Sequence, residues 1–134
     1  MNFLSSDLVV RMHEVLLDKW GGEEGGGHRG SQYEGVEAAV QAVHNSYYQS
    51  VPELAAAYAV YIVQGHVFMD GNKRTGWAAL STFLEANGGG CDAPVEQRVK
   101  VMIELQSRAE SGQRTDTLIA WLVQTLGLRG RASA

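Results

Sequence analysis

Apolar residues recur along most of this chain at intervals of three and four positions, which is the spacing of one face of an α-helix. Glycine-rich or polar breaks separate the apolar stripes, and no segment outside residues 21–30 indicates a strand. The stripes occupy residues 8–20, 36–47, 54–62, 77–84, 95–106 and 118–126. The pattern predicts an all-α fold, a single-domain bundle of about six helices joined by short loops.

Several predicted helices have start and stop signals. Ser50 is a favourable N-cap residue with Pro52 in the first turn after it, and Gly127 ends the last helix. The stripe at 36–47 places Tyr47 on the same helical face as its valines. We therefore expect one folded domain over residues 1–128 and a frayed tail at 129–134.

The segment Gly21–Gly30 reads GGEEGGGHRG, with six glycines in ten positions. We expect no regular structure there, because glycine loses more conformational freedom on folding than any other residue. Two interpretations stay open. The segment is either a floppy connector or a mobile flap beside a functional site that becomes ordered when a substrate binds.

Composition narrows the class of protein. The chain has 134 residues, of which 45% are hydrophobic and 19% charged, as in an ordinary globular domain. The net charge is −4 and basic residues are scattered apart from short groups such as Lys73-Arg74, so we expect no nucleic-acid partner. No apolar run reaches about 18 residues, so we expect no membrane span, and Asp7 argues against a signal peptide. The one cysteine, Cys91, excludes an internal disulfide and fits a cytoplasmic protein.

The most unusual stretch is His66–Gly76, which reads HVFMDGNKRTG. It combines an imidazole, a carboxylate, an amide, two cations and a hydroxyl between two largely apolar segments, Leu54–Val63 and Trp77–Leu84. Polar groups held between core-forming segments cost free energy, and a functional site is the usual reason for them. The less specific interpretation is a charged turn between two helices, with Phe68 buried and His66 packed in the core.

The residue types favour an anion-binding site at the start of a helix. Gly71 permits a tight turn, and Asn72 can bond to the nearby backbone and begin a helix whose first N–H groups point at an anion. Lys73 and Arg74 add positive charge, which the helix dipole disfavours at this end. A bound polyphosphate would remove that conflict, so these four residues are the candidate nucleotide-binding set.

Two further side chains indicate chemistry on a bound phosphate. Asp70 is an oxygen ligand of the kind that Mg²⁺ shares with phosphate groups, and His66, four residues earlier, is the candidate general base. His13 lies near the apolar stripe of the first predicted helix, and we expect it to be packed or exposed rather than a ligand.

The stretch HVFMDGNKRTG closely resembles the motif HxFx[D/E]xN[G/K]R of the Fic/Doc family. Lys73 stands where Fic enzymes carry a glycine, which makes the chain similar to the Doc branch. The segments GVEAAVQAV and AALSTFLEANGG also look Doc-like, so the resemblance covers most of the chain. It implies an all-α fold with a flap near residues 21–30.

For function, the resemblance implies the toxin of a toxin–antitoxin pair. Such a toxin uses ATP to phosphorylate a threonine of translation elongation factor Tu, which arrests translation, and an antitoxin segment folds onto it. AMP transfer, as in Fic enzymes, is the alternative; Lys73 and Trp77, which stands where Fic enzymes carry a second arginine, count against it. A non-catalytic binding domain of the same fold would predict a gap at His66 or Asp70, and both residues are present.

Overall fold

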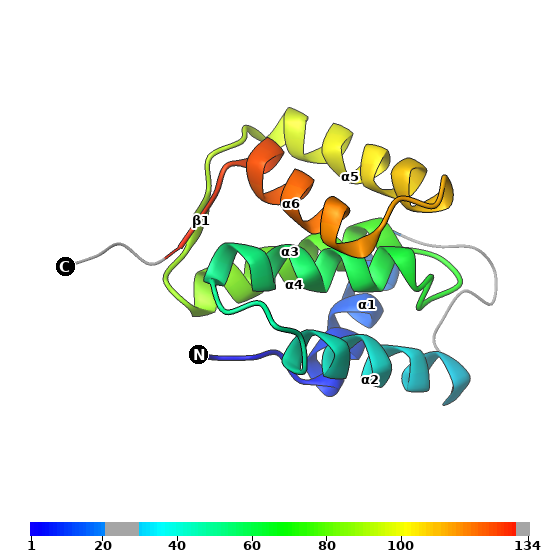
Figure 1. The fold of residues 1–134 in the computed structure, drawn as a ribbon. Coiled ribbons are helices and arrows are strands. Elements are labelled where there is room, and N and C mark those ends of the chain that lie inside the picture. The colour runs from blue at the N-terminus through cyan, green and yellow to red at the C-terminus, as the bar shows by residue number, and fades with distance from the viewer. Residues whose placement is uncertain (21–29, 131–134) are drawn as a thin grey trace.

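The computed structural model describes residues 1–20 and 30–130, and within them the side chains of residues 1–19 and 34–130. The described elements are α1 (Ser6–Trp20), α2 (Gly30–His44), α3 (Val51–Gln64), α4 (Asn72–Ala86), β1 (Gly90–Cys91), α5 (Val95–Glu110), α6 (Thr115–Leu126) and β2 (Leu128–Arg129). The helices form three tiers, with α3 and α4 between α5 and α6 on one side and α1 and α2 on the other (Figure 1). The predicted all-α bundle of about six helices is confirmed.

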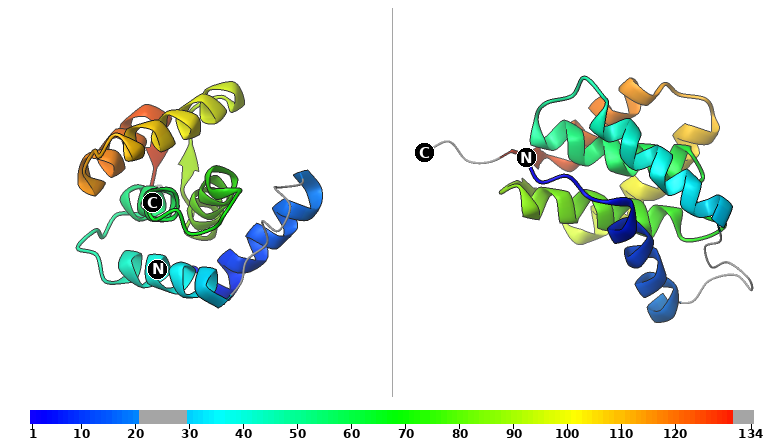
Figure 2. Two further views of the ribbon diagram at one scale, coloured as in Figure 1. Left: turned by 90° about the vertical axis from the view of Figure 1, so that its right-hand side faces the viewer. Right: turned by 90° about the horizontal axis from the view of Figure 1, so that it is seen from below.

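The centre of the bundle is α3, which packs against α2, α4, α5 and α6 (Figure 2). Its start follows the sequence signals: the hydroxyl of Ser50 accepts a hydrogen bond from the Glu53 N–H at 3.3 Å, and proline lies in the first turn. The helix is apolar on every face and is accordingly buried from Leu54 to Val60. Its alanines let α4 approach closely, since a Cβ added to Gly76 would lie 3.4 Å from the Ala59 carbonyl oxygen.

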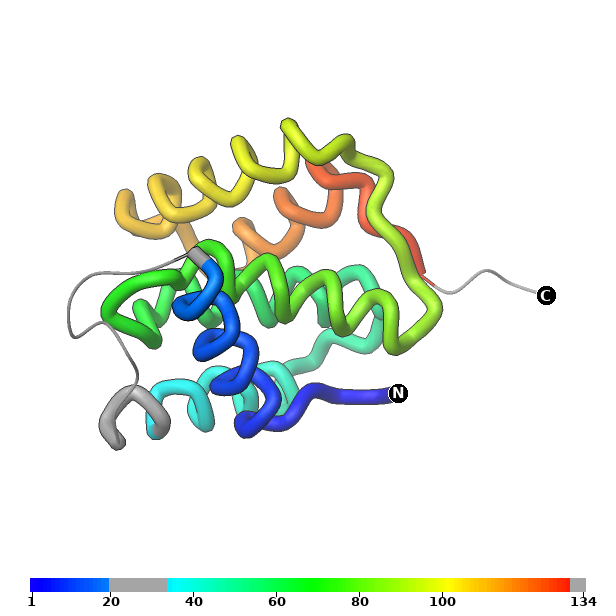
Figure 3. The backbone as a smooth tube through the Cα atoms, turned by 180° about the vertical axis from the view of Figure 1, so that it is seen from behind, coloured from blue at the N-terminus to red at the C-terminus, as the bar shows by residue number. Residues whose placement is uncertain are grey.

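The first helix, α1, lies against the start of α4 (Figure 3). The hydroxyl of Ser5 accepts a hydrogen bond from the Leu8 N–H at 3.1 Å and so caps the helix. Val9, Val10 and His13 are buried on its inner face. This packing brings α1 to the loop between α3 and α4, although about fifty residues separate them in the sequence.

A short antiparallel ladder joins two segments that the sequence did not indicate as strands. Gly90 pairs with Arg129 and Cys91 with Leu128. The side chain of Arg129 also forms an ion pair with Asp92, in which the Arg129 Nε lies 2.6 Å from the Asp92 Oδ1. Arg129, which we expected to begin a frayed tail, is therefore part of β2, while residues 131–134 lie outside the described part of the chain.

The expectation for Tyr47 was wrong. The helix α2 ends at His44, where the Ser46 N–H and hydroxyl both bond to the Val43 carbonyl, at 3.2 and 2.7 Å. Tyr47 therefore lies beyond the helix, is 77% exposed, and stacks on Tyr48 instead of packing in the core.

The glycine-rich segment, for which we expected no regular structure, lies outside the described residues from position 21 to position 29. Its last residue, Gly30, is the first residue of α2, so that helix starts earlier than its apolar stripe. In the ranges that are described, no helix is both long enough and apolar enough to cross a membrane.

Candidate active site

The polar stretch forms the turn from α3 into α4, and His66 lies where α3 ends. The His66 N–H donates to the Val63 carbonyl at 3.2 Å, and its φ of 46° places it in the left-handed region that few side chains adopt. The position before it requires glycine, since a Cβ on Gly65 would lie 2.7 Å from the Tyr61 carbonyl oxygen. The turn therefore holds His66 exposed at the surface, in a backbone conformation that costs about 1–3 kcal/mol.

The loop is anchored by apolar residues and by one amide. Val67 and Phe68 are buried, with exposed fractions of 7% and 1%. The Asn72 Oδ1 accepts a hydrogen bond from the Phe68 N–H at 3.0 Å, and its Nδ2 donates to the Phe68 carbonyl at 2.7 Å. Both polar atoms of this buried amide therefore bond to the loop backbone. The side chain of Asn72 holds the loop in its conformation and has no polar atom left to contact a ligand.

Asp70 lies half-buried at the tip of the turn. Its Oδ1 accepts a hydrogen bond from the Gly71 N–H at 2.8 Å. Its backbone carbonyl lies 2.9 Å from the Nε2 of His13, which is buried in α1. The ring of His13 also stacks on Phe68, with 3.7 Å between the ring centroids and 4° between the planes.

The helix α4 starts immediately after this turn. Gly71 is its N-cap, with a left-handed φ of 82° and no side-chain capping bond, and the Thr75 N–H closes the first helical turn onto the Gly71 carbonyl at 2.9 Å. The N–H groups of residues 72–74 precede the intrahelical ladder and point toward the start of the helix. An anion placed there would accept hydrogen bonds from these N–H groups, and the positive end of the α4 dipole would stabilise it further.

The two cations of the motif differ in their surroundings. Lys73 reaches α5, where its Nζ donates to the Gln106 Oε1 at 2.5 Å. Arg74 is exposed, and with Lys73 it lines a groove of about 580 Å³ between α4 and α5. The groove also contains Trp77 and Arg98, whose guanidinium carbon lies 5.4 Å from the centre of the indole ring. Positive charge is therefore concentrated along this edge of α4.

A smaller hollow of about 220 Å³ opens on the His66 side of the motif. His66 and Asn72 line it together with Gln106 and Glu110 of α5. Gln106 thus connects the two hollows. It lines the smaller hollow, and its side chain accepts a hydrogen bond from Lys73, which lines the larger groove. The predicted residues His66 and Asn72 share one hollow, and the predicted pair Lys73 and Arg74 shares the other.

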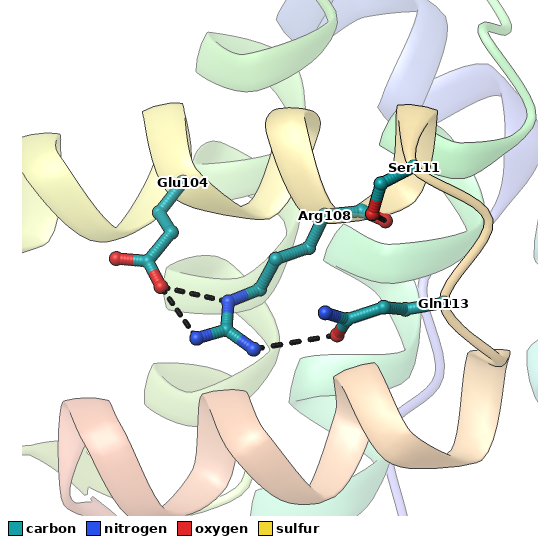
Figure 4. Close-up of polar contacts among 4 residues, drawn as sticks. All are labelled: Glu104, Arg108, Ser111 and Gln113. Carbon is teal, nitrogen blue, oxygen red and sulfur yellow. Dashed lines mark hydrogen bonds and ion pairs between the residues drawn. The ribbon is translucent and has the colours of Figure 1, made fainter.

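The end of α3 is also held from the side of α6. The Gln64 amide donates to the Gln113 carbonyl at 3.2 Å and accepts from the Thr115 hydroxyl at 2.6 Å. The turn that carries Gln113 is itself fixed by Arg108, which bonds to Glu104 at 2.7 Å and to the Gln113 side chain at 3.3 Å (Figure 4). These contacts fix the last turn of α3, two residues before His66.

A model of the Fic/DOC family matches residues 3–84 of this chain. The chain belongs to the Fic/DOC family. It is similar to Protein kinase doc of Escherichia phage P1, with 32% identity over 89 residues that cover 66% of this chain and 70% of the relative. It is also similar to Toxin Doc of Mycolicibacterium smegmatis, with 38% identity over 63 residues, 46% of this chain and 48% of the relative. The resemblance to the Doc branch of the family is therefore confirmed.

The family match covers α1, α2, α3 and most of α4, and so includes the whole stretch His66–Gly76. It ends before α5, which supplies Gln106, Glu110 and Arg98 to the surroundings of the Fic/DOC motif. Sequence reasoning missed these three residues and the contact from His13. No local signal would have found them, because each comes from another helix and has no unusual neighbours in the sequence.

The residues present fit a magnesium ion that is shared with phosphate groups. In residues 1–20 and 30–130, no three His, Cys, Asp or Glu side chains gather to form a metal site of their own. Asp70 is a carboxylate immediately before the N-terminal end of α4, which is the end of a helix where anions are favoured. Mg²⁺ is commonly bound by one or two carboxylates with substrate phosphates. The donor set therefore suits a metal that arrives with a nucleotide.

Proposed function

We propose that this Fic/DOC protein is the toxin of a toxin–antitoxin pair, a kinase that transfers the γ-phosphoryl group of ATP to a threonine of translation elongation factor Tu and so arrests translation. One observation carries the proposal: an exposed histidine, His66, lines the same hollow as Asn72, the first residue of a helix whose first turn also holds Lys73 and Arg74. The kinase name of the phage relative and the toxin name of the mycobacterial relative support the same class of activity.

In this proposal, His66 accepts the proton of the threonine hydroxyl as the oxygen forms a bond to the γ-phosphorus. The bond between that phosphorus and the bridging oxygen breaks, and ADP leaves. An exposed position suits this role, because the acceptor hydroxyl belongs to another protein. The N–H groups at the start of α4, from Asn72 to Arg74, hold the phosphate oxygens, and the two cationic side chains offset their charge.

Asp70 is the proposed ligand of the magnesium ion, which when bound would neutralise part of the phosphate charge. The role of Asn72 differs from the expectation in one respect. Because both atoms of its amide bond to Phe68, it serves the nucleotide site through its backbone N–H and through the shape of the loop.

AMP transfer is the alternative chemistry, and it would require the α-phosphate to face His66. Lys73 occupies the position of an open glycine in Fic enzymes, and its contact with Gln106 fixes it across the gap to α5. Trp77 stands where Fic enzymes carry a second arginine, so α4 lacks that cation. Arg98 of α5 nevertheless places its guanidinium over the indole ring of Trp77. The Arg98 Nε donates to the Ala93 carbonyl at 2.7 Å, which ties that guanidinium to the segment before α5.

The deciding experiment incubates the protein with elongation factor Tu and ATP that is labelled separately at the α- and γ-positions. We expect label from the γ-position on the elongation factor and a mass gain of one phosphate. Label only from the α-position would identify AMP transfer, and no label from either position would refute this target. Arrest of growth on expression, relieved by a short reading frame next to the gene, tests the toxin–antitoxin assignment separately.

A further inference from the structure

His13 contacts three residues of the loop that carries the proposed site, although 57 residues separate it from Asp70. Its Nε2 bonds to the Asp70 carbonyl at 2.9 Å, and its ring stacks on Phe68. It also covers Gly71, because a Cβ added there would lie 3.5 Å from the His13 Cδ2 and 3.6 Å from the Nε2.

The chemistry of the hydrogen bond between His13 and the Asp70 carbonyl determines which atom is the donor. A carbonyl oxygen only accepts hydrogen bonds, so the Nε2 of His13 carries the hydrogen and donates it. The Asp70 carbonyl and the Gly71 N–H belong to one planar peptide group, and that N–H donates to the Asp70 Oδ1 at 2.8 Å. Holding the carbonyl therefore orients the whole peptide plane, and the peptide plane orients the carboxylate.

We propose that His13 is a positioning residue, which holds the Asp70–Gly71 peptide so that the carboxylate and the start of α4 face the same magnesium-bound nucleotide. This inference rests on the proposed function, because it assigns His13 an effect on the binding of that nucleotide. It makes α1 a part of the site.

The test compares variants that separate the hydrogen bond from the packing. His13→Phe keeps a ring against Phe68 but loses the donor, whereas His13→Gln keeps an N–H donor of similar reach. Val9→Ala is the matched control, since Val9 is buried on α1 one turn before His13 and its loss destabilises the helix packing alone. Melting temperature and the affinity for ATP, with and without Mg²⁺, are measured for each purified full-length protein by calorimetry.

We expect His13→Phe to lower the affinity for ATP about tenfold in the presence of Mg²⁺, the effect of one misplaced hydrogen-bonded contact, and to change the affinity without Mg²⁺ much less. His13→Gln should recover most of the loss, and Val9→Ala should lower the melting temperature while keeping the full effect of Mg²⁺. In an Asp70→Asn background, His13→Phe should have little further effect on binding, because His13 acts through Asp70.

An unchanged effect of Mg²⁺ in folded His13→Phe, or equal losses in His13→Phe and Val9→Ala, would overturn the positioning role while leaving the proposed function intact. A wild-type protein that binds ATP no more tightly with Mg²⁺ would refute the magnesium role of Asp70, and the role of His13 with it. A wild-type protein that binds no ATP under either condition would instead refute the proposed nucleotide site. If His13→Phe does not fold, His13→Leu, which is smaller and also lacks the donor, takes its place with the same expected and contrary results.

Discussion

The buried amide of Asn72 provides a direct test of how the loop is held. Asn72→Ala removes the two hydrogen bonds to Phe68 and leaves the backbone N–H and carbonyl of a residue that is 1% exposed without their partner. Each bond contributes about 1 kcal/mol net, and each buried group left unpaired adds a further penalty of about 1 kcal/mol or more. Partial relaxation of the loop reduces the sum, so we expect a loss of about 3 kcal/mol in the free energy of unfolding.

Urea titration followed by far-UV circular dichroism measures this loss, and the corresponding fall in melting temperature is about 10 °C for a domain of this size. Asn45→Ala is the control, because Asn45 is an exposed amide in a loop and its loss should change stability by less than about 0.5 kcal/mol. A loss below about 1 kcal/mol in Asn72→Ala, or equal losses in both variants, would refute the assignment of Asn72 as the brace of the loop.

Three other substitutions test the proposed roles of the motif. His66→Ala should abolish transfer and growth arrest while leaving the circular dichroism spectrum and melting temperature at least at the wild-type level; a folded variant that still arrests growth would exclude His66 as the base. Asp70→Asn keeps the size of the side chain but removes its charge, so calorimetry should show ATP binding that no longer depends on Mg²⁺, and an unchanged dependence would assign the metal elsewhere. Lys73→Gln removes a cation from the disfavoured end of α4, so the free protein should gain about 0.3–1 kcal/mol of stability while its affinity for ATP falls severalfold; a loss of stability would show that the contact with Gln106 outweighs the dipole.

The parts of the fold that sequence reasoning predicted are those that local signals specify. Ser50 begins α3 through its own hydroxyl, and the turn chemistry of Gly71 marks the start of α4. The apolar stripes predicted six helices because each stripe reflects which face of one helix meets the core. None of these inferences required knowledge of how the helices are placed relative to one another.

The features that were missed depend on contacts between distant segments. A two-residue strand such as β2 is too short to show alternation, and it pairs only because the chain after α6 meets the chain after α4. Tyr47 continued the spacing of α2, but Ser46 ended the helix before it. The contact from Gln106 to Lys73 spans 33 positions, and nothing in the local sequence of either residue predicts it.

Three departures from local structural preference fall within ten residues of this chain, and their concentration argues against a merely structural turn. His66 adopts a left-handed backbone, Lys73 lies at the end of α4 that disfavours cations, and the hydroxyl of Thr75 is buried with no hydrogen-bond partner among the described residues. The simpler interpretation, a charged turn with His66 packed in the core, predicts a buried imidazole, whereas His66 is exposed and the core contacts come from Val67 and Phe68. A turn that only connected α3 to α4 would not need any of these costs, each of the order of 1 kcal/mol, so their concentration here supports our proposal that the turn carries a binding site.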